Sequence, residues 1–509
     1  MKTRNFARLL AALLALCMLY ALFAACGKGD NGDDSKGTTT TSSSAAGQVS
    51  GDESTPTTTA EPDPLENLPT GDYKGEVFRI CTVSHNWASS NILADEITGD
   101  RVEDAKYERT AQVSERLGLT FEEEIGTVAE VRQRLKNQCM SGTLDYDLFS
   151  TDPSFAYQSA FDGYLTDIGE LPGVDLTAPW WAGKYNDSVN MGGKTYVAFG
   201  DTSLVYHGAF YVVVFNKNMI DEYKLEDPYD LVDSKKWTWD KMHEMMVTVA
   251  QDVNSNGAAD GDKDIFGLSG HRVHFKHFLV TSNVYITDTD PVTGNPVYAG
   301  FSEKFYDAYQ KMLNYFIAPE ELSTIDGVSQ NLKGHTGSVA GQGYYRDVFR
   351  QGRSLFITEG TGGMYMYKET DFPYGIVMFP MYEENWDEIT TAVYSQPSGL
   401  VVPYTTSDAE RTGAVLECMT AYSYKIVRPE FIENTLYYKY AQDPRSVEMI
   451  ETILNNGSVD RSFAFNFGNI STLFDSALAA KNANITSMIK SAEKVIQATI
   501  NQYVGKLSK

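Results

Sequence analysis

The chain has 509 residues, 42% of them hydrophobic, and a formal net charge of −26 at pH 7. The excess of acidic side chains argues against nucleic acid or anionic lipid as a binding partner, because both carry negative charge. The hydrophobic fraction is typical of a globular protein with an apolar core.

The first 25 residues are predicted to be a lipoprotein signal peptide. Basic residues precede an apolar run at 9–23, which is shorter than the about 20 residues of a membrane span. The run ends in FAAC, which resembles a bacterial lipobox, a motif whose cysteine receives a lipid after cleavage. Phe23 stands where Leu is usual, whereas the two alanines agree with the motif. We expect lipidation at Cys26; an ordinary cleaved signal is the alternative.

Residues 26–67 are predicted to carry the lipidated cysteine and a disordered tether. The segment is rich in Gly, Ser, Thr, Asp and Pro and has almost no large apolar residues. Burial therefore cannot offset the conformational entropy that ordering would cost. A lipid followed by a flexible tether predicts a globular body held outside the cytoplasm at a membrane surface.

About 440 residues follow the tether, enough for two or three domain-sized units. Their first part alternates strand-like and helix-like segments. Strands are predicted at 77–83, 119–125 and 146–150, and helices at 101–117 and 128–140. This alternation is typical of a parallel sheet with helices on its faces.

The next part opens with an apolar run at 209–215, AFYVVVF, which predicts a buried strand. Thr238 can cap a helix whose first turn contains Asp240. Later elements are predicted as a strand at 265–268, a helix at 301–316, strands at 354–358 and 374–380, and mostly helical chain at 408–440 and from 446 onward.

Between these elements, residues 252–264 have the spacing of an EF-hand-like loop, D-x-N-x-N-G-x-x-D. Lys263 stands at the twelfth position, where an EF-hand has Glu, so Asp262 or Asp264 must complete the coordination. An Asx/Gly-rich surface turn is the alternative. We predict a structural Ca²⁺ bound by Asp252, Asn254, Asn256, the carbonyl group of Ala258, Asp260 and Asp262.

Five segments in order resemble bacterial extracellular solute-binding lipoproteins of the carbohydrate type, which serve ABC importers. They are 193–198 (GKTYVA), 212–228, 237–242 (WTWDKM), 352–356 and 440–453. The loop at 252–264 also resembles the calcium loop of alginate-binding members, with Gly261 where those members have a further acidic residue.

The resemblance implies an α/β fold of the type II periplasmic-binding-protein class, with two lobes, a hinge and a cleft between the lobes. It implies a first lobe of residues 68–200 plus 354–403 and a second lobe of residues 201–353 plus 404–509. It also implies a function without catalysis. The lobes would close on a small solute, most often a carbohydrate, and deliver it to the permease subunits of an importer.

Open α/β sheets bind ligands beyond the carboxyl ends of their strands. Carboxylates, amides and Arg can pair with the hydroxyl groups of a sugar, and aromatic rings can pack on its apolar face, although most aromatic residues belong to cores. The candidates that follow predicted strands or crossovers are Asn86, Trp87, Thr151, Asp152, Asp201, His271, Arg272, Glu359, Tyr365 and Trp386, with His274 and Tyr394 nearby in the sequence.

Two other functions stay open. An extracytoplasmic glycoside-active enzyme needs two carboxylates across a cleft, and a sensor partner would share the same fold. The sequence has no GxSxG, HExxH or P-loop motif, and GTGGM at 360–364 is a weak glycine match that a plain loop explains. Cys81, Cys139 and Cys418 are widely spaced, and we expect buried free thiols.

Overall fold

The computed structural model describes residues 65–338, 343–433 and 444–508. All of them belong to one compact unit, Pro62–Lys509. The predicted signal peptide, Cys26 and nearly all of the predicted tether lie outside the described residues. Within these ranges, no helix combines the length and the apolar character that a membrane crossing needs.

The first sheet has five strands in the described part of the chain, in the order β2-β1-β3-β13-β4. β1 pairs in parallel with both β2 and β3, as the alternation of strands and helices predicted. A strand from much later in the chain, β13, lies antiparallel to β3 and β4. The strands are β1 (Glu76–Val83), β2 (Leu119–Gly126), β3 (Leu148–Thr151), β4 (Leu165–Thr166) and β13 (Gly399–Pro403).

Local signals fix the helices around this sheet. The carboxylate of Asp100 accepts hydrogen bonds from the N–H groups of Val102 and Glu103 and starts the first long helix, which Gly118 ends in a left-handed conformation (φ 62°). The helices are α2 (Arg101–Leu117), α3 (Val128–Ser141), α4 (Pro153–Phe161), η1 (Ile168–Glu170), α5 (Gly183–Val189), α13 (Ala409–Tyr422), η6 (Ser423–Val427) and α14 (Arg428–Phe431).

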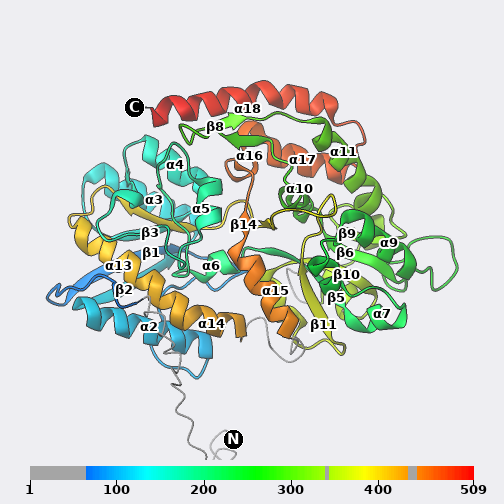
Figure 1. Cartoon of the computed structure of the whole chain (residues 1–509), viewed down its shortest axis with the longest axis horizontal. Helices are drawn as coiled ribbons and strands as arrows, with labels where there is room; N and C mark the ends of the chain where they lie inside the picture. Colours follow the sequence, from blue (N-terminus) through cyan, green and yellow to red (C-terminus); the bar gives the residue numbers. More distant parts are fainter. Residues whose placement is uncertain (1–64, 339–342, 434–443, 509) are drawn as a thin grey trace, which may run out of the picture. The chain divides into compact units, whose positions relative to one another are not determined.

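The second described sheet also has five strands, in the order β11-β5-β10-β6-β9 (Figure 1). β6 pairs in parallel with β9 and β10, whereas β5 runs antiparallel to β10 and β11. The predicted strand YVVVF is buried at every position. The strands are β5 (Tyr211–Asn216), β6 (Phe266–His271), β9 (Ser323–Asp326), β10 (Ser354–Gly360) and β11 (Tyr374–Met378).

Helices cover this second sheet, and Thr238 caps one of them as predicted, because its side chain accepts a hydrogen bond from the N–H of Lys241. They are α7 (Lys217–Glu222), α8 (Pro228–Asp233), α9 (Trp239–Val249), η2 (Arg272–His274), α10 (Lys276–Thr281), α11 (Glu303–Met312), η3 (Leu313–Ile317), η4 (Gln330–Leu332), α12 (Tyr344–Arg350), η5 (Thr361–Tyr367) and α15 (Pro444–Asn455).

Each sheet with its helices forms a lobe, and the predicted lobe boundaries were wrong in two places. Residues 354–403 were assigned to lobe 1, yet β10 and β11 lie in the sheet of lobe 2 and only β13 joins lobe 1. Residues from 404 onward were assigned to lobe 2, yet α13 and η6 pack on α2 of lobe 1. The first error arises because a buried apolar strand does not reveal in its sequence which sheet it joins. In the second case, long-range packing on α2 places the helices in lobe 1.

The segments that run between the lobes lie side by side. β12 (Thr391–Ala392) pairs in parallel with β14 (Gly457–Ser458), and Phe210 forms an antiparallel bridge with Val393. The N–H of Tyr394 donates to the carbonyl oxygen of Ala209 over 2.7 Å. In Figure 1, β14 lies between the two sheets. These short pairings hold the connecting segments together.

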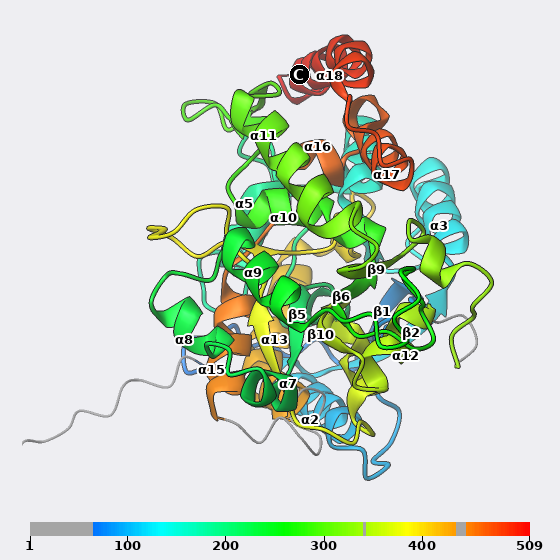
Figure 2. The ribbon, with the colours of Figure 1, turned by 90° about the vertical axis from the view of Figure 1, so that its right-hand side faces the viewer.

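The C-terminal helix α18 (Thr486–Leu507) reaches both lobes (Figures 1 and 2). It packs against β8, and its Tyr503 ring lies 5.0 Å from the Phe161 ring of α4 between ring centroids. The remaining elements are α6 (Leu204–His207), β7 (Thr287–Thr289), β8 (Pro296–Tyr298), α16 (Arg461–Ala464), η8 (Phe467–Asn469) and α17 (Ile470–Ala479).

The three cysteines in the described part of the chain, Cys81, Cys139 and Cys418, are buried free thiols, as predicted. Burial raises the pKa of Cys139 to about 11 and the pKa of Cys418 to about 12, and it also raises the pKa of Cys81. All three side chains are therefore protonated and unreactive at neutral pH.

Candidate functional site

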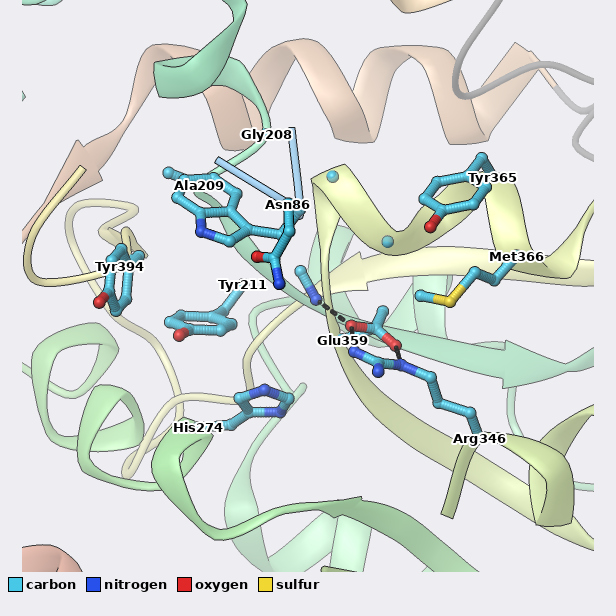
Figure 3. Close-up of a pocket in the computed structure, with 14 residues that line it drawn as sticks. Asn86, Gly208, Ala209, Tyr211, His274, Arg346, Glu359, Tyr365, Met366 and Tyr394 are labelled. Carbon is cyan, nitrogen blue, oxygen red and sulfur yellow. Dashed lines mark hydrogen bonds and ion pairs between the residues drawn. The ribbon is translucent and has the colours of Figure 1, made fainter. Parts of the chain in front are cut away.

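A cavity of about 570 Å³ lies where strands of both lobes end (Figure 3). Lobe 1 contributes the loop that follows β1, and lobe 2 contributes the end of β10, the turn η5 and the turn η2 after β6. The carboxyl ends of strands are the expected ligand position in open α/β sheets. The volume also falls in the usual range for small-molecule sites, about 300–1,000 Å³.

Aromatic side chains from four places in the chain line the cavity: Trp87, Tyr211, Tyr365 and Tyr394. The Trp87 ring meets Tyr394 edge to face, with centroids 5.7 Å apart, and lies 4.8 Å from the ring of His85. The imidazole of His85 is in turn hydrogen-bonded to Ser398 over 2.9 Å. Trp87 is only half-buried and Tyr365 is 48% exposed, so their ring surfaces remain accessible to a ligand.

The polar part of the wall contains a tightly held ion pair. The Arg346 guanidinium donates from Nε to Oε2 of Glu359 over 2.6 Å and from Nη2 to Oε1 over 2.9 Å. The hydroxyl of Tyr367 donates to Oε2 over 2.6 Å, and the N–H of Gly360 donates to Oε1 over 2.9 Å. Glu359 is 2% exposed, so its carboxylate is held by four hydrogen bonds inside the wall.

His274 is a neutral part of the wall. Its Nδ1 lies 3.0 Å from the hydroxyl oxygen of Thr358, and its ring packs on Tyr211 with centroids 4.8 Å apart. Burial, followed by the nearby His271, holds the pKa of His274 well below its usual value. At neutral pH the imidazole is uncharged and offers hydrogen bonding without charge.

Four of the predicted ligand contacts lie together at this cavity. Asn86, Trp87, Glu359 and Tyr365 line the cavity, together with the nearby His274 and Tyr394. Tyr211 and Arg346 were missed. Tyr211 is the first residue of β5, whose sequence predicts a fully buried strand. Arg346 lies in the helix α12 and does not follow a predicted strand.

Six predicted ligand contacts lie elsewhere. Thr151 and Asp152 are buried, and Asp152 caps α4 and pairs with Arg132. Asp201 is buried in the crossover, where its Oδ1 lies 2.7 Å from Nε2 of His207.

His271 caps η2 through the N–H of Val273, and Arg272 reaches the carbonyl oxygen of Gly327. Trp386 lines two separate hollows, one beside α8 and α15 and the other beside Asn283 and Lys304. Polar residues that follow strands therefore do not all line the cavity. Several of the six start helices or hydrogen-bond to neighbouring loops instead.

The loop at 252–264 turns its side chains onto its own backbone. Asp252 accepts from the N–H of Gly257 over 2.8 Å, and Asn256 accepts from the N–H of Ala258 over 2.8 Å. Asp262 points out of the loop, because its Oδ1 accepts from the hydroxyl of Tyr344 over 2.6 Å. Within the described ranges, no three His, Cys, Asp or Glu side chains are grouped for a metal ion.

Packing explains why residue 261 is a glycine and not an acidic residue. A Cβ at this position would lie 2.3 Å from the carbonyl oxygen of Asn331, so the loop has no room for a side chain there. The remaining candidate oxygen donors of the loop are Asp252, Asn254, Asn256, the carbonyl group of Ala258 and Asp260, whereas Asp264 accepts hydrogen bonds from the N–H groups of Val253 and Asp260.

Three solved structures share this fold over most of the chain. An ABC substrate-binding protein from Listeria monocytogenes in complex with cycloalternan matches with a TM-score of 0.51 and 13% identity over 85% of this chain and 99% of that chain. A cyclic alpha-maltosyl-1,6-maltose binding protein from Arthrobacter globiformis matches with a TM-score of 0.54 and 15% identity over 84% and 100%. The chain has the type II periplasmic-binding-protein fold.

A sugar transporter from Rhizobium etli in an open conformation matches with a TM-score of 0.54 and 15% identity over 84% of this chain and 99% of that chain. No family model matches the sequence, and no curated protein matches it. At this level of identity the likeness establishes the fold, and the function has to be argued from the site.

Proposed function

We propose that the protein is the substrate-binding lipoprotein of an ABC importer and that it captures a carbohydrate or oligosaccharide by lobe closure. The observation that carries the proposal is the cavity between the carboxyl ends of β1 and β10, lined by residues of both lobes. A solute that contacts both lobes favours the closed state over the open one. Three structures of the same fold are described as binding proteins for oligosaccharides or as a sugar transporter.

The lining suits a sugar. Trp87, Tyr365 and Tyr394 offer ring surfaces for the C–H face of a pyranose, while Asn86, His274 and Arg346 offer hydrogen bonds to hydroxyl groups. This combination of a few polar groups within an aromatic wall is typical of small-molecule sites.

The arrangement favours binding over glycoside hydrolysis. A glycosidase needs one carboxyl group as acid and a second as nucleophile or base, about 5–9.5 Å apart across the bond to be cleaved. Among the described residues that line the cavity, Glu359 is the one carboxylate, and it is bonded to Arg346 and Tyr367. We therefore assign the protein no catalytic step.

The matched pair Trp87→Ala and Trp386→Ala tests the position of the site. A thermal-shift screen with neutral and acidic mono- to pentasaccharides, followed by calorimetry, would first identify a ligand. Loss of the Trp87 ring surface removes apolar contact with a sugar and is expected to weaken binding by about 1–3 kcal/mol, or about 5- to 150-fold. Trp386→Ala should leave the affinity unchanged. A cleaved sugar detected in the same mixtures would favour the hypothesis of a glycoside-active enzyme instead.

We further propose that the protein is anchored outside the cytoplasm by a lipid on Cys26 and delivers its solute to permease subunits. The support is the lipobox-like FAAC at 23–26 and the polar, flexible composition that follows. Metabolic labelling with palmitate should mark the wild type and not Cys26→Ala. Co-purification with a histidine kinase instead of a permease would support the sensor-partner alternative.

We also propose one structural calcium ion in the loop at 252–264. The support is the spacing of Asp252, Asn254, Asn256 and Asp260 around the left-handed Gly257 (φ 74°). The ion would hold the loop between α9 and β6 in shape and would take no part in solute binding.

A further inference from the structure

The cavity wall contains charge, but the charge is internally balanced. Arg346 is the cation and Glu359 the anion, and they are joined by two parallel hydrogen bonds of 2.6 and 2.9 Å (Figure 3). This fork geometry is the strongest common form of ion pair between side chains. An acidic ligand would meet a guanidinium whose charge Glu359 already neutralises.

The glycine-rich turn after β10 offers no compensating anion site. Glycine-rich turns can bind anions when consecutive backbone N–H groups point outward. Here the N–H of Gly360 donates to Glu359, the N–H of Thr361 donates to the carbonyl oxygen of Phe210 over 2.8 Å, and the N–H of Gly362 donates to that of Gly208 over 2.9 Å. Three successive donors are therefore already bonded inside the protein.

Asp152 and Lys276 are each paired with an opposite charge inside the protein as well. Asp152 is bonded to Arg132, and Nζ of Lys276 lies 3.1 Å from the carboxylate of Asp475. His274, the remaining basic group of the wall, is neutral for the reasons given above. The chain as a whole carries a net charge of −26, which repels anions at long range.

We propose that the cavity selects an uncharged glycan over an acidic one, with Glu359 as the residue that determines this preference. Glu359 leaves Arg346 in the wall as a donor of hydrogen bonds to hydroxyl groups and removes it as a counter-charge for carboxylates. Arg346 retains Nη1, which takes no part in the two bonds to Glu359. This inference rests on the proposed carbohydrate-binding function.

The test compares matched trisaccharides by calorimetry at two salt concentrations: mannotriose with the mannuronic acid trimer, and galactotriose with the galacturonic acid trimer. If the inference holds, the wild type binds a neutral sugar at least tenfold more tightly than its uronate counterpart, with little dependence on salt. Equal or tighter binding of the uronate overturns the inference and leaves the carbohydrate-binding function standing. If no sugar of either kind binds, here or in the wider panel above, the proposed function itself fails.

The variant Glu359→Gln tests the inference through an expected gain of uronate binding. The substitution keeps the size of the side chain but frees the charge of Arg346, so uronate binding should tighten at least tenfold and become weaker at high salt. Tyr367→Phe is the matched control, because it removes one hydrogen bond to Glu359 without changing the charge. It should keep the preference for the neutral sugar. If Glu359→Gln does not fold, the wild-type comparison decides alone.

Discussion

Gly362 of the turn η5 lies against the backbone of the loop that follows β1, beside the cavity. A Cβ at this residue would lie 2.1 Å from the carbonyl oxygen of Trp87 in lobe 1 and 3.0 Å from that of Gly208. Both obstacles are backbone atoms, so a side chain cannot avoid them by changing rotamer. Gly362→Ala can be accommodated only if the loop after β1 moves away from the turn η5, which is movement in the direction of opening.

Gly362→Ala should raise the free energy of the closed state relative to the open state. Overpacking by one methyl group typically costs about 1–3 kcal/mol. If the open state escapes this cost, the apparent affinity for solute falls by about 5- to 150-fold, because the closed state is less populated. Calorimetry with the solute found by the screen measures the change in affinity. Small-angle scattering with and without solute shows whether the lobes still close.

Gly505→Ala provides the matched control. Gly505 lies exposed in α18, and a Cβ there would meet no heavy atom within 4 Å. This change should add about 0.5–1 kcal/mol of stability, as alanine does in helices, and leave the affinity unchanged. The reasoning about closure is refuted if Gly362→Ala binds solute as tightly as the wild type. It is also refuted if the variant loses as much thermal stability without solute as it loses in affinity.

Three further predictions concern stability. Calcium at 100 times its Kd should stabilise the wild type by about 2.7 kcal/mol and raise its Tm. Asp252→Ala should abolish this rise in Tm. Asp290→Ala is the control, because it removes another exposed turn carboxylate and should keep the rise. Glu417→Ala should lower the free energy of unfolding by about 3 kcal/mol, since it strands the buried indole N–H groups of Trp180 and Trp181, while solute affinity stays unchanged. Burial holds the pKa of His274 and of His277 well below the unfolded value of about 6.5. Below pH 6.5 the unfolded chain therefore takes up protons that the folded protein does not. The free energy of unfolding then falls by up to about 1.4 kcal/mol per pH unit for each of the two histidines. Tm measured from pH 7.5 to 5 should show this slope, and His277→Phe should reduce it by the contribution of one histidine.

Local order was predictable because its causes are local. The helix predicted at 101–117 has the same bounds in the structure, since Asp100 caps it and Gly118 ends it within the same short segment. The strand predicted at 209–215 is β5 (Tyr211–Asn216) in the structure, and it was predictable for a similar reason, because a short apolar run is typical of a buried strand. The sheet that each later strand joins was not predictable, because β10 finds its partners β5 and β6 through long-range pairing alone.

The same distinction applies to the site. Asn86 and Trp87 were found because the carboxyl end of β1 is a local feature that the fold turns toward the cleft. Arg346 was missed because nothing near it in the sequence indicates a partner; α12 brings it to Glu359 only in the folded protein. Asp152 was wrongly placed in the site because a polar residue after a strand can equally start the next helix, as it does for α4.

The GTGGM turn shows how packing can give a glycine motif a different meaning from the one its composition indicates. Gly363 leaves room for Glu359, since a Cβ there would lie 2.8 Å from Oε1 of that carboxylate. Gly362 leaves room for the backbone of Trp87. One turn therefore packs against Glu359 and also against the loop that follows β1. Charge selection and lobe closure should consequently be separable by mutation, with Glu359→Gln changing which sugar binds and Gly362→Ala weakening all of them alike.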